Sequence, residues 1–397
     1  MTPEKAAELY PKMCKIGQDG TLELYLDNHM LSGWRMCEAY FEEEFLSHPG
    51  KQLTPIGRTW GLEFGSYVHK CMEYFYLAQR EDWEGHFPIL DRNNASVVGR
   101  TTQNLVSFLQ LVSDHWKFAD LDWFMQPEFK KGLGKTAQAL GGHDGAITLF
   151  TQYYKQYWRQ ERFRFVGSEL TFGHGKEFLL YEFPCVVRFY YCGRIDQIVD
   201  DTVTIGPMDF KTASYFDGTE RDGFKPDDGM QGYVAFVQHH LKSKFAAEGR
   251  LCNTMIIRHI SVRYEKEERF KSSFITYTPV EMAMWHARQI KTFKQIYEAL
   301  IEDTGFVWNT RACNNGFYYH KCPFKQLHDV SPAYRDGLIK TFYQIQDAWS
   351  YDRNGGNNAK DLQVLQSKSA QEVSVDNRTQ SDIDMAVSET PSKDKVL

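Results

Sequence analysis

The sequence predicts an α/β protein with a mixed central β-sheet flanked by helices. Three observations support this prediction. Helical periodicity dominates the chain up to about residue 165, β-rich runs lie between residues 167 and 264, and helical periodicity returns at residues 229–243 and 279–302. Of the 397 residues, 42% are hydrophobic and 15% are aromatic, which is enough to bury a substantial core.

The first part of the chain is expected to be helical. Residues 1–50 are predicted to be mostly helix. In residues 59–84, apolar side chains recur at helical spacing, namely Tyr67, Val68, Cys71, Met72 and Phe75. Residues 100–165 are again mainly helical and are interrupted by the glycine-containing stretches KKGLGK and GGHDG. We therefore expect a helical insertion over about residues 85–165.

The middle of the chain is expected to form strands. Its β-rich runs are bounded by Gly, Pro and Asp, and they read GSELTF, EFLLYEFPCVVRFYYCGRIDQIV, TVTIGPMDFKT and TMIIRHISVRY. Helices followed by strands and then by further helices indicate a mixed α/β core.

The C-terminal tail has a different composition. From Asp352 onward it is polar, rich in Ser, Asn and Asp, and almost free of aromatic residues. Such a segment cannot bury enough apolar surface to order itself. The predicted organisation is one domain over residues 1–351 and a disordered tail over residues 352–397.

Composition also bears on where the protein acts. No run of about 18 apolar residues is present, so we expect no membrane contact. The N-terminus does not resemble a signal peptide, and eight scattered cysteines favour a reducing compartment. A cytoplasmic location is expected. The net charge of -6 gives no global signal for nucleic acid, so any DNA contact would come from a local patch.

Residues 192–214 place charged side chains where apolar residues belong. Asp209 and Lys211 share one face of a predicted strand, with Phe210 on the other face, and the preceding strand brings Asp196 alongside. Two carboxylates about 4 Å apart repel by roughly 4 kcal/mol at an effective dielectric constant near 20. A divalent cation such as Mg²⁺ or Mn²⁺ would offset this repulsion. A surface salt bridge between Asp209 and Lys211 is the alternative.

The stretches GRID and MDFKT resemble motifs II and III of the PD-(D/E)XK nuclease superfamily. The resemblance is to the branch that contains the RecB and AddB nuclease domains, the CRISPR-associated exonucleases and related phage exonucleases. Three further stretches match that branch in the same order. FGSYVHKCMEYF is similar to its Gly-x-x-x-His helix, VGSELTF to its motif I strand, and GMQGYVAFVQ to the helix that follows motif III. Together the matches cover about residues 30–330.

The resemblance implies a restriction-endonuclease-like core and a metal-dependent DNA exonuclease. The expected substrate is linear DNA, single-stranded or duplex, in recombination, repair or phage DNA metabolism. A bacterial or phage-infected cell is the implied setting, with a recombination or annealing protein as partner. The implied ligands of Mg²⁺ or Mn²⁺ are His69, Asp196, Asp209 and the backbone carbonyl of Phe210. A DNA-binding or assembly module that retains the fold without catalysis is the alternative function.

The same resemblance assigns roles to three further residues. Lys211 is expected to orient the attacking water, and Glu169 is expected to be the motif I acid, with Glu177 and Glu182 nearby as alternatives. Gln231 is expected to belong to the catalytic set. The family helix reads Gln-x-x-x-Tyr, but Ala235 stands at the tyrosine position here. Gln231 is equally compatible with an ordinary residue on a helix surface, and His69 with a histidine tolerated on an amphipathic helix.

A second group of candidate metal ligands, made of cysteines and a histidine, lies in the flanks, residues 30–45 and 305–330. Several members of the same branch join these flanks with a four-cysteine iron–sulfur cluster. The resemblance places Cys37, Cys313, Cys322 and His328 at the four positions. Three cysteines and one histidine also form a good zinc shell, and histidine is an unusual cluster ligand. The remaining alternative is that the thiols simply pack in the core.

Overall fold

The structure is a computed structural model. It describes residues 1–57, 59–83, 95–130, 133–158, 160–161, 163–173, 178–200, 204–214, 223–246, 252–263, 269–302, 304–315 and 322–347. The chain divides into two units, Met1–Tyr351 and Asp352–Leu397. The second unit, for which the sequence predicts a disordered tail, lies outside the described residues. So do residues 84–94 of the insertion and residues 316–321 of the C-terminal cysteine flank.

A mixed β-sheet forms the centre of the described part of the chain. Its strands are β1 (Cys14–Ile16), β2 (Leu22–Asp27), β4 (Arg164–Phe172), β5 (Leu179–Phe183), β6 (Val187–Asp200), β7 (Ile205–Ala213), β8 (Thr254–Ser261) and β9 (Phe270–Thr276). The strand order is β1-β2-β6-β7-β8-β9, and β4 and β5 also pair with β6. The pairs β2–β6 and β7–β8 are parallel, and the other pairs are antiparallel. The predicted mixed α/β class is confirmed.

The prediction that residues 1–50 are mostly helical is wrong over β1 and β2. In the stretch TLELYLD, Leu22, Leu24 and Leu26 alternate with other residues, and all three are fully buried. This period of two is a strand signal. β2 pairs in parallel with the central strand β6, so the sheet includes strands that precede the helical insertion.

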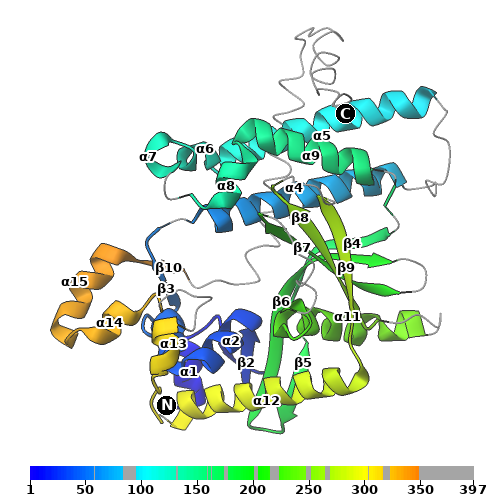
Figure 1. The fold of residues 1–397 in the computed structure, drawn as a ribbon. Coiled ribbons are helices and arrows are strands. Elements are labelled where there is room, and N and C mark those ends of the chain that lie inside the picture. The colour runs from blue at the N-terminus through cyan, green and yellow to red at the C-terminus, as the bar shows by residue number, and fades with distance from the viewer. Residues whose placement is uncertain are drawn as a thin grey trace. The chain divides into compact units, whose positions relative to one another are not determined.

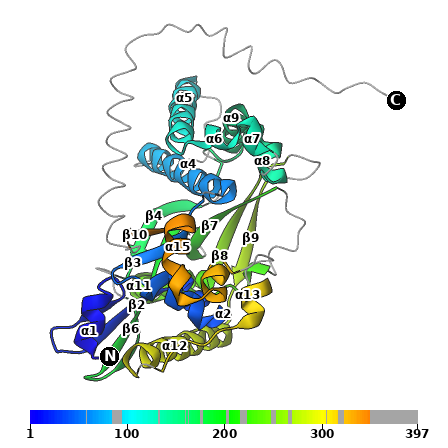
Figure 2. The same cartoon turned by 90° about the vertical axis from the view of Figure 1, so that its left-hand side faces the viewer.

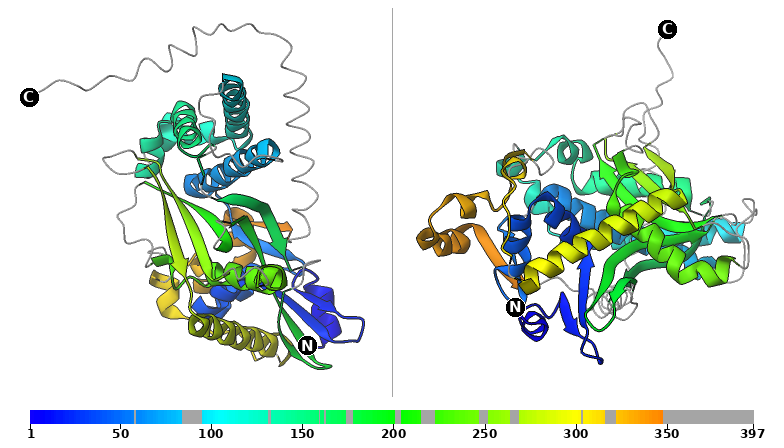
Figure 3. Two further views of the ribbon diagram at one scale, coloured as in Figure 1. Left: turned by 90° about the vertical axis from the view of Figure 1, so that its right-hand side faces the viewer. Right: turned by 90° about the horizontal axis from the view of Figure 1, so that it is seen from below.

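Helices cover both faces of the sheet (Figures 1 and 3). One face carries α4 (Trp60–Trp83), α5 (Ala95–Phe118) and α9 (His143–Tyr157), and the other carries α11 (Asp228–Ala246) and α12 (Pro279–Glu302). The short helices α6 (Leu121–Phe124), α7 (Pro127–Lys130) and α8 (Lys135–Leu140) complete the helical insertion. In the part of the chain that the structure describes, none of the helices is both long and apolar enough to cross a membrane.

Segments from the N-terminal and C-terminal parts of the described chain meet beside the sheet (Figure 2). β3 (Lys51–Pro55) and β10 (Tyr343–Asp347) pair in antiparallel fashion. The neighbouring elements are α1 (Pro3–Leu9), α2 (Asn28–Met36), α3 (Glu38–Phe41), the π-helix η1 (Glu42–Leu46), α13 (Thr310–Asn315), α14 (Lys325–Asp329) and α15 (Pro332–Phe342). Segments about 300 residues apart in sequence are therefore held together here.

Aromatic side chains join each helical layer to the sheet. On the α11 and α12 side, Phe236 stacks on Phe172 at 4.1 Å and Phe293 stacks on Phe189 at 5.0 Å. On the other side, the Tyr153 ring meets the edge of Phe270 at 5.1 Å. Burial of such rings is the main apolar contribution to folding.

Gly232 lets α11 approach β6 closely. A Cβ atom at this position would lie 2.4 Å from the Tyr191 hydroxyl oxygen and 2.5 Å from Tyr191 Cε1. Tyr191 is buried and cannot move aside. Gly337, in contrast, lies in the exposed helix α15, where an added Cβ would meet open space.

We expect the two glycines to respond oppositely to alanine. Gly232→Ala should lower the free energy of unfolding by about 1–3 kcal/mol because it overpacks the helix–sheet contact. Gly337→Ala should raise it by about 0.5–1 kcal/mol because alanine is the better helix former. Urea denaturation of the three proteins measures both changes. A Gly232→Ala protein as stable as wild type would contradict the close approach.

Candidate active site

The hairpin of β6 and β7 brings the predicted acids together. Its antiparallel register pairs Gln197 with Met208, so the residues before Gln197 lie beside those after Met208. The Phe210 amide donates a hydrogen bond to Asp196 Oδ2 at 3.2 Å. Lys211 Nζ lies 2.6 Å from Asp209 Oδ2. Both carboxylates are buried.

The histidine predicted from the Gly-x-x-x-His helix reaches this hairpin. His69 lies on α4, and its Nδ1 atom is 3.1 Å from Asp196 Oδ2. The His69 ring also meets the Phe210 ring edge-on at 6.2 Å between centroids. The structure therefore brings His69, Asp196, Asp209 and Lys211 into one cluster.

Burial and mutual charge shift the pKa of each group in this cluster. Burial raises the pKa of Asp209 to about 6; Lys211 opposes this shift and Asp196 adds to it. Burial by itself would raise the pKa of Asp196, but the His69 charge and hydrogen bond outweigh it and lower that pKa. Burial alone would lower the pKa of His69, yet Asp196 and Asp209 raise it to about 9.

Glu169 lies on the strand that pairs with the other edge of β6. In that register Ser168 faces Gln197 and Leu170 faces Ile195, which places Glu169 beside Asp196. Burial raises the pKa of Glu169 to about 7, with Arg194 opposing the shift.

The backbone at Glu169 is strained. Its φ angle is 48°, in the left-handed region that costs a non-glycine residue about 1–3 kcal/mol. Of the alternatives for the motif I acid, Glu182 on β5 pairs with Arg188 at 2.7 Å, and Glu177 lies outside the described residues. The structure thus places Glu169 at the acidic cluster.

Three residues around the cluster were not predicted as site residues from the sequence. Arg194 Nε lies 3.0 Å from Glu169 Oε2, and Arg194 precedes Asp196 by two positions on one strand. Glu73 is buried four residues after His69 on α4, and its charge acts on Glu169. Both spacings place side chains on one face, so the signal was present in the sequence.

The third missed residue is Tyr233 on α11. Burial, with the charges of Asp209 and Asp196 adding to it, raises the pKa of Tyr233 well above its ordinary value. Tyr233 also meets the Phe172 ring edge-on at 6.5 Å. The pattern Gln-x-x-x-Tyr did not predict it as a site residue, because it stands two positions after Gln231 instead of four and so lies on another helical face.

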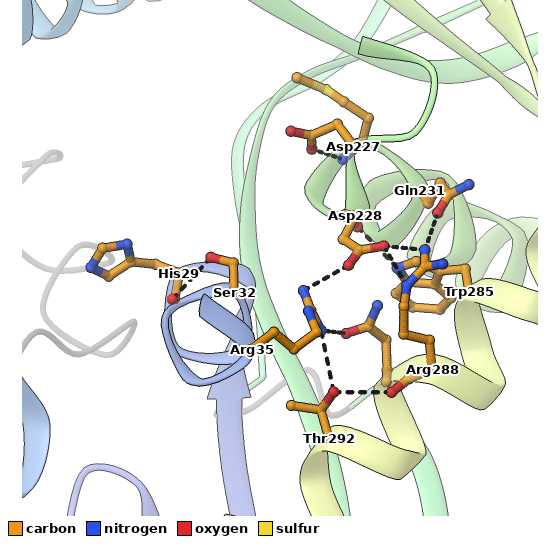
Figure 4. A network of polar contacts seen from close by, with 11 residues as sticks. His29, Ser32, Arg35, Asp227, Asp228, Gln231, Trp285, Arg288 and Thr292 are labelled. Carbon is orange, nitrogen blue, oxygen red and sulfur yellow. Dashed lines mark hydrogen bonds and ion pairs between the residues drawn. The ribbon is translucent and has the colours of Figure 1, made fainter. Parts of the chain in front are cut away.

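Gln231 belongs to a different network (Figure 4). Its Oε1 atom accepts a hydrogen bond from Arg288 Nη2 at 3.1 Å. Arg288 and Arg35 both pair with Asp228 at the start of α11, and the Arg35 contact is 2.6 Å. Among the described residues, the Gln231 side chain therefore joins α11 to α12 and makes no hydrogen bond to Asp196 or Asp209.

The predicted cysteine and histidine set is only partly brought together. Cys37, Cys313 and Cys322 lie in one buried cluster between the flanks, and burial, with Cys37 adding to it, raises the pKa of Cys313. His328 Nε2 instead lies 3.4 Å from Glu43 Oε1, and its ring stacks on Trp308 at 4.8 Å. The imidazole therefore has other partners than the three thiols.

The predicted ligand side chains are not arranged as a complete metal coordination shell. Among the residues that the structure describes, no group of three or more His, Cys, Asp or Glu side chains is placed to hold an ion. At the acidic cluster the reason is visible, because His69 Nδ1 contacts Asp196 Oδ2 directly.

Comparison with known proteins assigns no family to the chain. Neither the models of known protein families nor the curated proteins contain a match to this sequence. The motifs and the geometry of the acidic cluster are therefore the basis for a functional proposal.

The His69–Asp196 contact makes folding stability depend on pH. The pKa of His69 is about 9 in the folded protein, against 6.5 for the unperturbed group, so the folded state binds this proton more tightly than the unfolded chain. The resulting stabilisation is complete below pH 6.5 and is lost as the pH rises through about 9.

We expect wild-type protein to lose more stability over this pH interval than His69→Gln does. Urea denaturation at several pH values measures the difference between the two proteins. Parallel curves for the two proteins would show that His69 gains no charged partner on folding.

Proposed function

We propose that this chain is a metal-dependent deoxyribonuclease that hydrolyses phosphodiester bonds at the ends of linear DNA. The observation that carries the proposal is the buried cluster of Asp196 and Asp209 with His69 and Lys211. Buried carboxylates beside a lysine are costly for folding alone. Carboxylates of this kind can hold a divalent cation, and metal-assisted phosphodiester hydrolysis uses such a cation.

The donor set suits Mg²⁺ or Mn²⁺, which prefer hard oxygen ligands. Asp209 Oδ2 is buried, and its ion pair with Lys211 leaves it without a well-directed hydrogen bond among the described residues. A cation would offset the repulsion between Asp209 and Asp196. It would be held by His69, Asp196, Asp209 and the Phe210 carbonyl, in exchange for the present His69–Asp196 hydrogen bond.

The side chains have separate tasks in this proposal. A divalent cation supplies Lewis acidity and a more acidic bound water. Lys211 orients the attacking water, and its charge stabilises the negative charge that develops on the phosphate. Glu169 holds a second ion or a water molecule. Lys211 is suited to this role because Asp209 and Asp196 outweigh the effect of burial and keep its pKa above the ordinary value.

The order of elements supports a restriction-endonuclease-like core. The acids of the stretches that resemble motifs II and III lie on the antiparallel pair β6 and β7, and the acid of the stretch that resembles motif I lies on β4. The histidine helix α4 and the post-motif helix α11 lie on opposite faces of the sheet (Figure 1). Each motif that carries the resemblance thus falls on an element adjacent to the cluster.

A second candidate function is a DNA-binding or assembly module without catalysis. It is favoured by one observation, which is that each acid already has a basic partner in the chain: His69 with Asp196, Lys211 with Asp209, and Arg194 with Glu169. Such pairing stabilises the cluster without any cation.

Degradation of linear DNA decides between the two candidates. We expect wild-type protein to degrade linear DNA with Mg²⁺ or Mn²⁺ and to be inactive with excess chelator. Asp209→Asn and Lys211→Met should each reduce the rate by about 100-fold or more, because each removes a group that acts in the transition state.

The matched control is Lys325→Met. Lys325 lies on α14 and pairs with Asp329, so this variant should keep the wild-type rate. If wild type and all variants leave the DNA intact, the nuclease proposal is wrong, and DNA retention in a gel-shift assay would then favour the binding module.

The flank cysteines give a separate prediction about a second metal. If purified protein contains zinc or an iron–sulfur cluster there, the three thiols should hold it without His328, which contacts Glu43. We expect Cys313→Ser to lose the metal and His328→Ala to retain it, measured by elemental analysis and visible absorption of anaerobically purified protein. If His328→Ala also loses the metal, His328 is a ligand together with the three cysteines. If purified wild-type protein contains no metal, the three thiols only pack in the core.

A further inference from the structure

A buried ion pair lies on the α4 and α9 side of the sheet. Arg258 Nη2, on β8, is 2.8 Å from Glu161 Oε2, in the connection between α9 and β4. The two side chains are 1% and 3% exposed. The Arg258 guanidinium also lies over the Tyr157 ring, 3.9 Å from its centroid.

Two tyrosine hydroxyls extend this ion pair to α4. The Tyr76 hydroxyl donates to Glu161 Oε2 at 2.8 Å and lies 2.9 Å from the Tyr153 hydroxyl of α9. Since Tyr76 has one hydroxyl hydrogen and Glu161 accepts it, Tyr153 donates to Tyr76. The network therefore connects α4, α9 and β8.

Stability alone does not explain this network. Removing two charges from water costs about as much as their attraction returns, so apolar residues of similar size would serve folding equally well. Arg258 Nε and Nη1 have no hydrogen-bond partner among the described residues, which adds to the cost. A buried polar network of this kind is best attested as a device that fixes one register between packed elements.

The network contacts the acidic cluster through Phe210. Arg258 is the direct β8 neighbour of Phe210 in the parallel pair, so the two side chains share a face. The Tyr76 ring packs on Phe210 at 5.9 Å. Phe210 in turn donates its amide to Asp196, and His69 lies seven residues before Tyr76, which is two turns of the same helix.

We propose that Glu161, Arg258 and Tyr76 form a positioning network that sets the register of α4 on β7 and β8, and so holds His69 against Asp196. Its catalytic importance rests on the proposed nuclease function. The positioning itself does not, because the His69–Asp196 contact exists without DNA. None of the three residues touches the reacting atoms.

The test replaces the ion pair by apolar residues in Glu161→Leu/Arg258→Met and removes one hydroxyl in Tyr76→Phe. Selective ¹⁵N labelling of histidine reports whether His69 Nδ1 is hydrogen-bonded, with Asp196→Ala as the reference for the broken contact and His69→Asn for assignment. We expect both variants to fold, and the His69 signals of both to move toward their position in Asp196→Ala. DNA cleavage should fall roughly tenfold or more in kcat with little change in KM.

Tyr67→Phe is the matched control. Tyr67 also lies on α4 and donates its hydroxyl to the Val112 carbonyl at 3.1 Å, but it is outside the network. Removal of the Tyr67 hydroxyl should leave the His69 signals unchanged. The proposal would be overturned if the His69 signals of Tyr76→Phe, or of a folded double variant, were the same as those of wild type. If the double variant does not fold, the His69 signals of Tyr76→Phe alone decide the question. Absence of cleavage by wild type would refute the nuclease function alone, because the His69 signals still test the positioning.

Discussion

The feature on which the structure depends is the burial of Asp196 and Asp209 beside each other. A buried carboxylate is tolerated only when it has a compensating charge or hydrogen bonds. His69, Lys211 and the Phe210 amide supply these. The compensation is uneven, since the pKa of Asp196 falls and that of Asp209 rises to about 6. Asp209 is thus the less fully compensated of the two carboxylates, and it is there that the proposed cation would act.

The partners of these acids come from different parts of the fold. Lys211 lies on the same strand as Asp209, whereas His69 comes from a helix that precedes the long helical insertion. The cluster therefore forms only when α4 packs against the sheet. In our proposal, residues that determine how α4 packs on the sheet, such as the Glu161–Arg258 pair, affect the acids without contacting them. The backbone of Glu169 is also strained, with a positive φ angle, and the surrounding structure must stabilise this conformation at the site.

Much of the architecture could be predicted from local patterns. Period-3.6 apolar spacing identifies α4, and β-rich apolar runs bounded by Gly, Pro and Asp identify β6 and β7. The alternation of successive side chains along a strand predicts that Asp209 and Lys211 share a face, as their ion pair shows. These predictions succeed because the geometry of one element relates only residues close in sequence. The strand β2 was missed even though its alternating leucines carry the same signal.

The sequence by itself determined the class of fold, the elements that carry the acids, and the set of chemically suited residues. Tertiary structure alone decided which of these meet. It joined Gln231 to Arg288 and His328 to Glu43, and it brought Tyr233 close to the acids. The physical reason is that a side chain's partner depends on how elements distant in sequence pack, and neither residue type nor spacing within one element specifies that packing.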